Sequence, residues 1–405
     1  MLTQSRRGFV IGTLAGAAAL AWSKDDSSGI ATDRKWRYGV IGSGTRSRGE
    51  HLPILRDYFP EVEVTALCDI TPENLEQGLK ICGGAPKGYT DYRKMLDEHP
   101  DLDAVVVCVP NYLHADIVVR ALEGGQHVLT EKPIATHLAD ATQMISAAEK
   151  HKRILQVGFQ MRQSNLYHRA ADLLAQGAIG DVELVFGSLF RGDWNPKGWQ
   201  YPDPKTGKKT NWRFLTYTSG GTLLEEGIHD LDIIHWLVGA SPKRIQAQGG
   251  NSVFRDRETI DNAEILIEFE NGVRCTFTMA LFTPAVPQAA ILRIFGSRAE
   301  MSYLEEDGKR YIVIQPYRGK AERIEAPYLK PEEQGVWKGS IGRGVEADAG
   351  VCTYREHQAF LHSIGTGEQP AVGATVGREA IHISLAAERS LHTGLPVEWN
   401  ESANL

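Results

Sequence analysis

The sequence has few cysteines, and their spacing does not indicate a metal or redox centre. Among its 405 residues there are five. They lie singly, mostly within apolar strand-like runs, and form no C-x-x-C pair. We therefore expect buried thiols and a fold that does not rely on disulfides. The five are Cys68, Cys82, Cys108, Cys275 and Cys352.

The sequence also lacks basic runs beyond its first residues, and it has no internal repeat or low-complexity segment. Its formal net charge is −7, from 44 Lys and Arg against 51 Asp and Glu. A negative chain without basic clusters is a poor partner for nucleic acid or an anionic membrane. The composition therefore predicts a small neutral or cationic partner and no nucleic acid.

The first residues resemble an export signal. An arginine pair within residues 5–10 precedes an apolar stretch, residues 10–20. That stretch is too short to span about 30 Å of hydrocarbon, and a small-residue A-x-A site follows it. The pattern predicts twin-arginine export to the periplasm, with cleavage before Trp22, and residues 1–35 as signal and N-terminal arm. An uncleaved anchor is the alternative. No other stretch could span a membrane, so none is expected in the mature protein.

Length and texture predict two domains of α/β class. About 380 residues follow the signal, enough for two cores. Between residues 36 and 159, apolar runs alternate with helical periods, which is typical of a doubly wound parallel sheet. Residues 160–405 contain longer alternating strands, and Asn271-Gly272 indicates a hairpin between two of them. We expect this second part to be an α+β domain with a large, mostly antiparallel open sheet.

A glycine turn follows the first predicted strand, residues 38–41. Its glycines would let the backbone approach a pyrophosphate at a helix N-terminus. Ser47 stands at the usual third glycine, so Gly49 is expected to allow the close packing instead. Asp69 ends the second strand, where a carboxylate accepts both ribose hydroxyls of NAD and repels the phosphate of NADP. These features predict a Rossmann domain that binds NAD. A turn or helix N-terminal role is the alternative for Asp69.

Two later strand ends carry further polar residues. Pro110, Asn111 and His114 follow one strand, and Glu131-Lys132-Pro133 follows the next. Ligands of open α/β sheets bind at the carboxyl ends of strands, so these groups are expected beside the glycine turn.

In this order along the chain, the motifs resemble the glucose-fructose oxidoreductase, inositol dehydrogenase and MocA (Gfo/Idh/MocA) family. The resemblance also uses residues 158–162 and 225–229, and it covers nearly the whole mature chain. It implies NAD as cofactor, and it places Arg162 and Tyr167 beside cofactor or substrate. It also implies a homo-oligomer, a dimer or tetramer, formed through the sheet of the second domain. The residues expected at the cofactor are Gly42, Ser43, Gly44, Thr45, Arg46, Asp69, Pro110, Asn111, His114, Glu131, Lys132 and Arg162.

The resemblance further implies that Lys132 lies by the nicotinamide and substrate, often with a cis Lys132-Pro133 bond. Oxidising a secondary alcohol needs a base for the hydroxyl proton and an acceptor for the hydride. A lysine partly desolvated beside a positive nicotinamide would have its pKa lowered, which suits it to share that proton. The alternative is a surface Glu-Lys pair at a strand end.

A second catalytic group is expected on a helix. Glu225, His229, Asp232 and Trp236 are spaced 4, 3 and 4 residues apart, so they share one helix face. The first three would meet the cleft, with Trp236 behind them. In the family His229 pairs with the lysine in proton transfer, whereas the position of Glu225 is usually aspartate. The alternative makes His229 a helix residue satisfied by its acidic neighbours. A metal site that adds His235 is disfavoured because no H-x-x-x-H spacing exists, so no metal is predicted.

Residues 190–217 combine aromatic residues with glycine, proline and lysine. A long segment of little periodicity inside a domain is commonly functional, and aromatic faces suit the apolar faces of sugar rings. We expect a carbohydrate-binding rim here. Packing of these aromatics onto their own domain or a neighbouring subunit is the alternative. The residues expected at the substrate are Tyr167, Trp194, Trp199, Trp212, Arg213 and Asp232.

The predicted function is an exported NAD-dependent oxidoreductase that acts on a hydroxyl of a sugar, glycoside or polyol. Free nicotinamide cofactor is a cytoplasmic compound, so the cofactor is expected to be tightly bound. The alternative is an NAD-dependent glycosidase, which oxidises a ring hydroxyl, eliminates the aglycone, adds water and reduces the ketone again. This chain keeps the Glu131-Lys132-Pro133 motif of the family, which favours the oxidoreductase over the glycosidase. A non-catalytic sensor is disfavoured by the presence of both Lys132 and His229.

Overall fold

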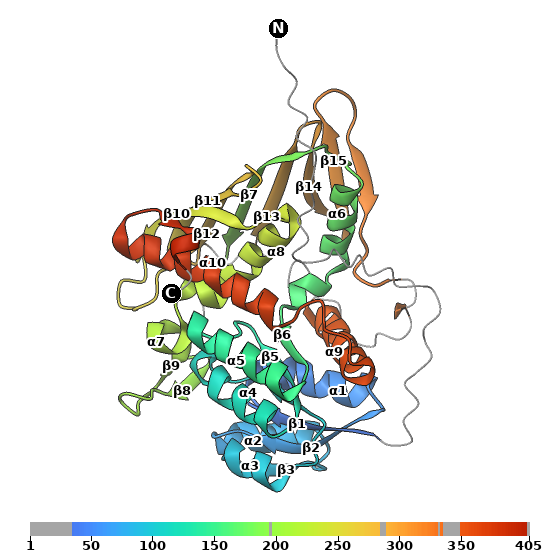
Figure 1. Cartoon of the computed structure of the whole chain (residues 1–405), viewed down its shortest axis with the longest axis vertical. Helices are drawn as coiled ribbons and strands as arrows, with labels where there is room; N and C mark the ends of the chain where they lie inside the picture. The colour runs from blue at the N-terminus through green and yellow to red at the C-terminus, as the bar shows by residue number, and fades with distance from the viewer. Residues whose placement is uncertain (1–34, 194–196, 284–288, 331–332, 335–348, 403–405) are drawn as a thin grey trace. The chain divides into compact units, whose positions relative to one another are not determined.

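The computed structural model describes residues 35–193, 197–283, 289–330, 333–334 and 349–402 (Figure 1). Nearly all of the predicted signal and arm, residues 1–35, lies outside this set, as does Trp194. None of the helices within the described ranges is long and apolar enough to cross a membrane.

The first sheet is parallel and doubly wound, as predicted. Its six strands follow the order β3-β2-β1-β4-β5-β6, and every neighbouring pair is parallel. The chain reverses its direction of winding between β1 and β4, which is where such sheets bind their ligands. The strands are β1 (Trp36–Ile41), β2 (Val62–Cys68), β3 (Lys87–Tyr89), β4 (Ala104–Val107), β5 (His127–Glu131) and β6 (Leu155–Gly158).

Both faces of this sheet are covered, because successive side chains of a strand point to opposite sides. Val40 contributes to a core shared with α1 (Leu52–Tyr58). Its neighbour Ile41 contributes to a second core with the helices on the other face. A parallel sheet buried on both faces needs continuous apolar strands, which explains the unbroken apolar run of β4. The remaining helices that pack here are α2 (Pro72–Ile81), α3 (Tyr92–Glu98), α4 (His114–Glu123) and α5 (Leu138–His151).

The second sheet has nine strands and is mostly antiparallel, again as predicted. Its order is β16-β15-β14-β13-β7-β12-β11-β10-β17, and within this sheet only the described pair β7 and β12 is parallel. Asn271-Gly272 joins β11 to β12, with Gly272 at φ +89°, which confirms the hairpin. The strands are β7 (Val182–Phe190), β10 (Pro242–Gly250), β11 (Asn262–Phe269), β12 (Arg274–Ala280), β13 (Ala289–Gly296), β14 (Ala299–Glu306), β15 (Lys309–Pro316), β16 (Glu322–Glu325) and β17 (Val397–Glu398).

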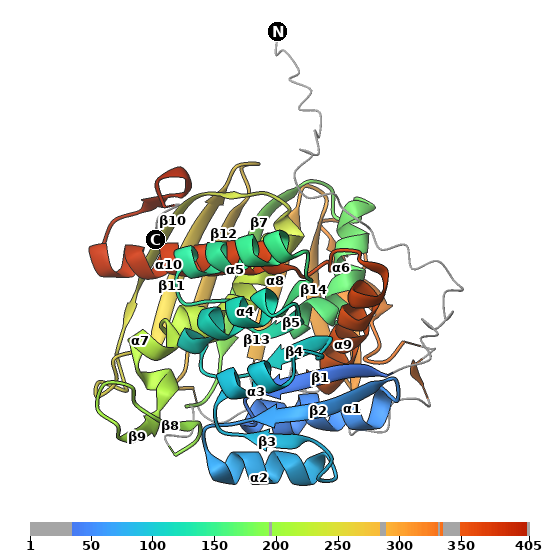
Figure 2. The same cartoon turned by 60° about the horizontal axis from the view of Figure 1, so that its bottom comes forward.

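Three helices cover one face of the second sheet: α6 (Asn165–Ala175), α8 (Ile228–Val238) and α10 (Ala374–Thr393) (Figure 2). Their apolar side chains share one core with the inward residues of the strands. The shorter elements are η1 (Ser47–His51), η2 (Asn111–Leu113), η3 (Gln160–Gln163), β8 (Gln200–Pro202), β9 (Lys209–Asn211), η4 (Trp212–Phe214), α7 (Thr216–Ser219), η5 (Leu223–Gly227) and η8 (Trp399–Glu401).

Two late helices extend the core of the first domain beyond residues 36–159. Helix α9 (Ala349–Thr366) places Phe360 and Ile364 in the same cluster as Tyr38 and Val40 of β1. Helix α10 adds Ile381 to the opposite core. The predicted assignment of residues 160–405 to one second domain therefore does not describe the packing of α9.

Phe360 provides a test of this packing. Its side chain is fully buried against Tyr38, with the ring centroids 6.1 Å apart. We expect Phe360→Ala to lower the free energy of unfolding by about 3–5 kcal/mol, because it leaves a cavity beside β1. Urea unfolding measures this, with Phe282→Ala as control because Phe282 is 38% exposed. Equal losses in the two variants would contradict the packing of α9 onto the first sheet.

Candidate active site

A large cavity of about 1330 Å³ is lined by residues from both domains. It extends from the glycine turn and Asp69 to Glu225 and His229 near the start of α8. Cofactor and substrate residues predicted from distant parts of the sequence therefore share one space. The predicted residues that line it are Gly42, Gly44, Thr45, Arg46, Asp69, Pro110, Asn111, Glu131, Lys132, Tyr167, Trp199, Trp212, Arg213, Glu225 and His229.

The glycine turn leaves its backbone open to the cavity. Gly42 has φ +97°, and a Cβ there would lie 2.0 Å from the carbonyl oxygen of Cys108, so only glycine fits. A Cβ on Gly44 would meet nothing within 4 Å. Gly49 also has open space, so the prediction that it permits close packing was wrong. Gly78 of α2 does this instead, since a Cβ there would lie 2.1 Å from Ser43 Oγ.

Asp69 has two roles, one toward the fold and one toward the cavity. Its carboxylate accepts hydrogen bonds from the amide of Ser43, at 2.7 Å, and from that of Thr71, at 2.8 Å. Burial raises the pKa of Asp69, and these two amides only partly offset that effect. A carboxylate offers about four lone-pair positions, so acceptor capacity remains on the cavity side. Ser43 itself is fully buried and acts through Asp69.

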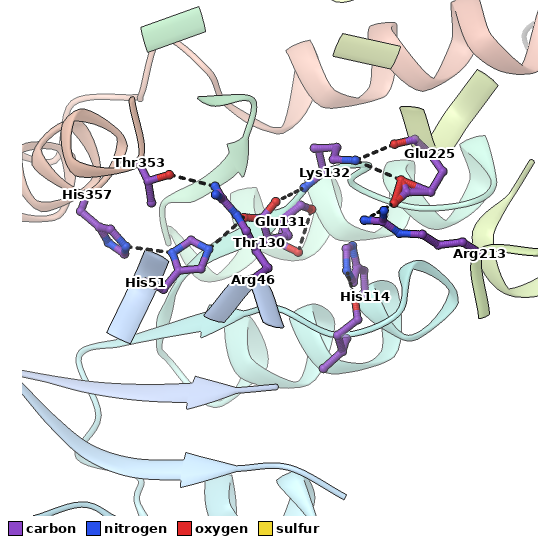
Figure 3. Close-up of polar contacts among 11 residues, drawn as sticks. Arg46, His51, His114, Thr130, Glu131, Lys132, Arg213, Glu225, Thr353 and His357 are labelled. Carbon is purple, nitrogen blue, oxygen red and sulfur yellow. Dashed lines mark hydrogen bonds and ion pairs between the residues drawn. The ribbon is translucent and has the colours of Figure 1, made fainter. Parts of the chain in front are cut away.

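Lys132, Glu225 and Arg213 form a buried ionic triad on the opposite side of the cavity (Figure 3). Lys132 Nζ donates to Glu225 Oε2 at 3.0 Å and to the Glu225 carbonyl oxygen at 2.6 Å. Arg213 Nη2 lies 2.8 Å from Glu225 Oε1. The Lys132-Pro133 bond is cis. Glu225, where the family pattern has aspartate, therefore holds two cations at once.

His229 is neutral near pH 7. Burial, and then the charge of Lys132, lowers the pKa of His229 to about 3. Its Nδ1 atom is buried and has no hydrogen-bond partner within the described part of the chain. A neutral imidazole with a ring nitrogen that makes no hydrogen bond can accept a proton, as a catalytic base must.

Glu131 joins the glycine turn to α9. Its Oε1 accepts from Arg46 Nε at 2.7 Å and lies 2.8 Å from His51 Nε2, while His51 Nδ1 lies 2.9 Å from His357 Nε2 (Figure 3). Burial raises the pKa of Glu131, but Arg46 and His51 more than offset it, so the pKa lies well below its usual range. The ligand atoms of Cys108, His51 and Glu131 lie close enough together to hold a metal ion. However, the positive charge of the Arg46 guanidinium already balances the negative charge of the Glu131 carboxylate.

Several predicted site residues do not line the cavity. Arg162 and Asp232 form a bidentate ion pair at 2.7 and 2.8 Å, with the Arg162 guanidinium 5.1 Å from the ring of Trp236. Asp232 follows His229 by three residues in the same helix α8, but its buried carboxylate pairs with Arg162 of η3 and not with the cavity. His114 is fully buried, and its two ring nitrogens contact the carbonyls of Val109 and Pro133.

The aromatic segment partly serves its own domain. The Arg213 guanidinium lies 4.3 Å from the ring of Trp199 and 5.5 Å from that of Trp212, so cation–π contacts hold it toward Glu225. Both rings still line the cavity. The structure thus combines the predicted rim with its packing alternative.

Sequence reasoning did not single out several lining residues. Glu226 pairs with Arg191 at the end of β7. Burial raises the pKa of Glu226, but Arg191, Lys132 and Arg213 together bring it below its usual value. Tyr303 and Arg310 reach the cavity from β14 and β15. Alternation identifies such strands but not the cavity that a side chain faces.

Comparison with known proteins agrees with this geometry. The sequence model of an oxidoreductase family with an NAD-binding Rossmann fold matches residues 36–159, and that of the GFO/IDH/MocA C-terminal domain matches residues 167–302. The chain belongs to the Gfo/Idh/MocA oxidoreductase family. Its cofactor is accordingly NAD, and the open glycine turn beside Asp69 fits that dinucleotide.

Relatives within the family match nearly the whole chain. Myo-inositol 2-dehydrogenase of Thermotoga maritima is 25% identical over 374 residues, which cover 90% of this chain and 99% of that protein. The structure of levoglucosan dehydrogenase with NADH is 21% identical, with a TM-score of 0.75 over 90% of this chain and 99% of the other. Aldose-aldose oxidoreductase from Caulobacter crescentus, complexed with glycerol, is 24% identical, with a TM-score of 0.71 over 90% and 100% of the two chains.

The charge state of His229 can be measured directly. We expect NMR of the histidine-labelled protein to show a neutral His229 imidazole from pH 8 down to pH 5, because its pKa is lowered to about 3. A free histidine side chain would titrate near pH 6.5. Lys132→Met should raise the His229 midpoint, since the lysine charge opposes protonation. His229→Asn assigns the signal, and a midpoint near 6.5 in the unmodified protein would contradict the assignment of a neutral base.

Proposed function

We propose that this protein is an exported NAD-dependent oxidoreductase that oxidises or reduces a hydroxyl-bearing carbon of a sugar or polyol. The main support is that Lys132 and a neutral His229 share one cavity with the glycine turn and Asp69. Relatives named inositol and levoglucosan dehydrogenases act on polyhydroxylated rings, and Trp199 and Trp212 give this cavity flat apolar surfaces.

The residues divide the reaction between two ends of the cavity. The glycine turn and Asp69 hold the dinucleotide, which supplies the hydride acceptor when bound. Lys132, fixed by Glu225, donates a hydrogen bond to the reacting oxygen and stabilises negative charge on it. His229 accepts the hydroxyl proton as the carbon gives up its hydride, so a secondary alcohol becomes a ketone. The reverse direction uses the same groups.

We propose that the chain reaches the periplasm by the twin-arginine route with its cofactor already bound. Because free nicotinamide cofactor is scarce outside the cytoplasm, a self-contained reaction, oxidising one sugar and reducing another, suits this location. The relative named aldose-aldose oxidoreductase gives a precedent for that chemistry within the same fold. A homo-oligomer, dimer or tetramer, stays a prediction.

A cofactor-free assay tests the reaction class. Purified mature protein, with bound NAD measured by mass and absorbance, is incubated with free sugars and with nitrophenyl glycosides, without added NAD. We expect bound NADH to form with one sugar and to be reoxidised by a second, while the glycosides stay intact. Release of nitrophenol without net NADH would contradict the oxidoreductase and establish the glycosidase.

Lys132→Met tests the catalytic assignment. We expect kcat to fall by at least about 100-fold, since a positioned proton-transfer or hydrogen-bonding group contributes about that much or more. Bound NAD should remain, because Lys132 acts at the substrate end. Lys80→Met, at an exposed lysine on α2, should keep full activity. Unchanged kcat in Lys132→Met, with NAD bound, would remove the lysine from the mechanism.

Export is tested by replacing Arg6 and Arg7 with lysine. We expect the unmodified chain in the periplasmic fraction, with Trp22 as its first residue, and the double variant in the cytoplasm at full length. Fractionation and N-terminal sequencing measure both outcomes. Equal periplasmic amounts of the two proteins would contradict twin-arginine export.

A further inference from the structure

The β8–β9 hairpin belongs to the second domain in sequence but lines the cofactor end of the cavity. Tyr201 of β8 and Lys209 of β9 share that space with Asp69 and Ile70, which follow β2. The hairpin thus faces the region where an NAD ribose would meet Asp69.

Fixed contacts hold the hairpin in this place. The side chains of Tyr201 and of Tyr112, which is on η2 in the first domain, lie close enough for each to affect the pKa of the other. One residue away, Asn111 Nδ2 donates to the carbonyl oxygen of Ser219 at 2.8 Å, and both residues are buried. Asn111, predicted as a cofactor ligand, therefore also ties η2 to the segment that follows the hairpin.

The hairpin also has a rigid turn. Asp203 Oδ1 accepts from the amide of Lys205 at 2.8 Å and from the hydroxyl of Tyr217 at 2.6 Å. Gly207 has φ +70°, a conformation that glycine adopts without strain. Tyr201 is consequently presented by a preorganised loop, which lowers the entropy cost of any contact it makes with a ligand.

The surroundings of Tyr201 suit a flat heteroaromatic ring. Ile70, directly after Asp69, is 56% exposed although its side chain is large and apolar. Burial, the neighbouring Tyr112 and the charge of Asp69 all raise the pKa of Tyr201, so its ring is neutral and lies near that carboxylate. A base held between an aromatic and an aliphatic side chain gains stacking and apolar contact without needing a sequence of hydrogen bonds.

We propose that Tyr201 forms the second-domain wall of the adenosine half of the NAD site, and that Tyr112 positions it. The hairpin thereby slows release of the cofactor. This inference rests on the proposed function, in which the cofactor is tightly bound, and gives a structural reason for that tight binding. Dissociation of NAD requires the Tyr201–Tyr112 contact to open or the dinucleotide to slip past it. Retention of the cofactor then depends on the β8–β9 hairpin of the second domain, whether or not the predicted N-terminal arm contributes.

NADH displacement tests this without any sugar. The protein is loaded with NADH and chased with excess NAD, and loss of protein-enhanced NADH fluorescence gives the dissociation rate. We expect Tyr201→Ala to raise this rate about tenfold and to weaken ADP-ribose binding by a similar factor. Nicotinamide mononucleotide, which lacks adenosine, should bind Tyr201→Ala as it binds the unmodified protein. Tyr317→Ala, at a tyrosine 61% exposed on the second domain, should change neither quantity.

Milder variants separate positioning from folding. Tyr201→Phe and Tyr112→Phe each remove one hydroxyl from the Tyr201–Tyr112 contact and keep both rings, so we expect equal, smaller increases in the NADH dissociation rate. The double variant should equal either single one. An unchanged rate in Tyr201→Ala, or equal weakening of ADP-ribose and nicotinamide mononucleotide, would overturn the proposal. Because no turnover is measured, either result is independent of whether the oxidoreductase or the glycosidase reaction is found.

Discussion

The cavity depends on one buried carboxylate, that of Glu225. It accepts Lys132 from the end of β5 and Arg213 from η4, and all three side chains are at most 17% exposed. Removing charged groups from water costs several kcal/mol per ion, which is recovered only when every charge is paired with good geometry. Loss of any member would leave a buried charge without its partner. The triad therefore fixes the distance between the first sheet and the helix that carries His229.

Glu131, the residue before Lys132, anchors a different part of the structure from the one that Lys132 anchors. It binds Arg46 of the glycine turn and His51, and His51 continues the contact to His357 on α9. Two adjacent residues at one strand end thus anchor different structures, because their side chains leave the strand on different sides. This gives a physical reason for α9 to pack on the first domain despite its late position in the chain.

Local patterns predicted the fold because each was set by a local requirement. The continuous apolar strands, the glycine turn and Asn271-Gly272 each need a particular backbone or a buried surface, and each occurs as predicted. The packing of α9 was not accessible, since an amphipathic helix shows that one face is buried but not against which sheet. Asp232 failed for a related reason. Its spacing placed it on the same face of α8 as His229, but the spacing could not show that Arg162 of η3 packs against it and binds its carboxylate. Sequence showed which polar groups share an element, and packing decided which of them share the cavity.

The same packing sets how protons can move. Burial, and then the charge of Lys132, which is paired with Glu225, keep His229 neutral. A neutral His229 beside a cationic Lys132 is a weak base, so it accepts a proton only from a group that has become strongly acidic. Loss of the hydride from the substrate carbon does this to the attached hydroxyl, because the oxygen becomes electron-poor as the carbonyl forms, and its proton passes to His229. The hydroxyl therefore becomes a better acid in the same step in which His229 acts as the base. Glu226, whose charge favours the imidazolium, adds to this effect from the adjacent position. Coupling of this kind uses no change in fold, only the placement of three charges around one imidazole.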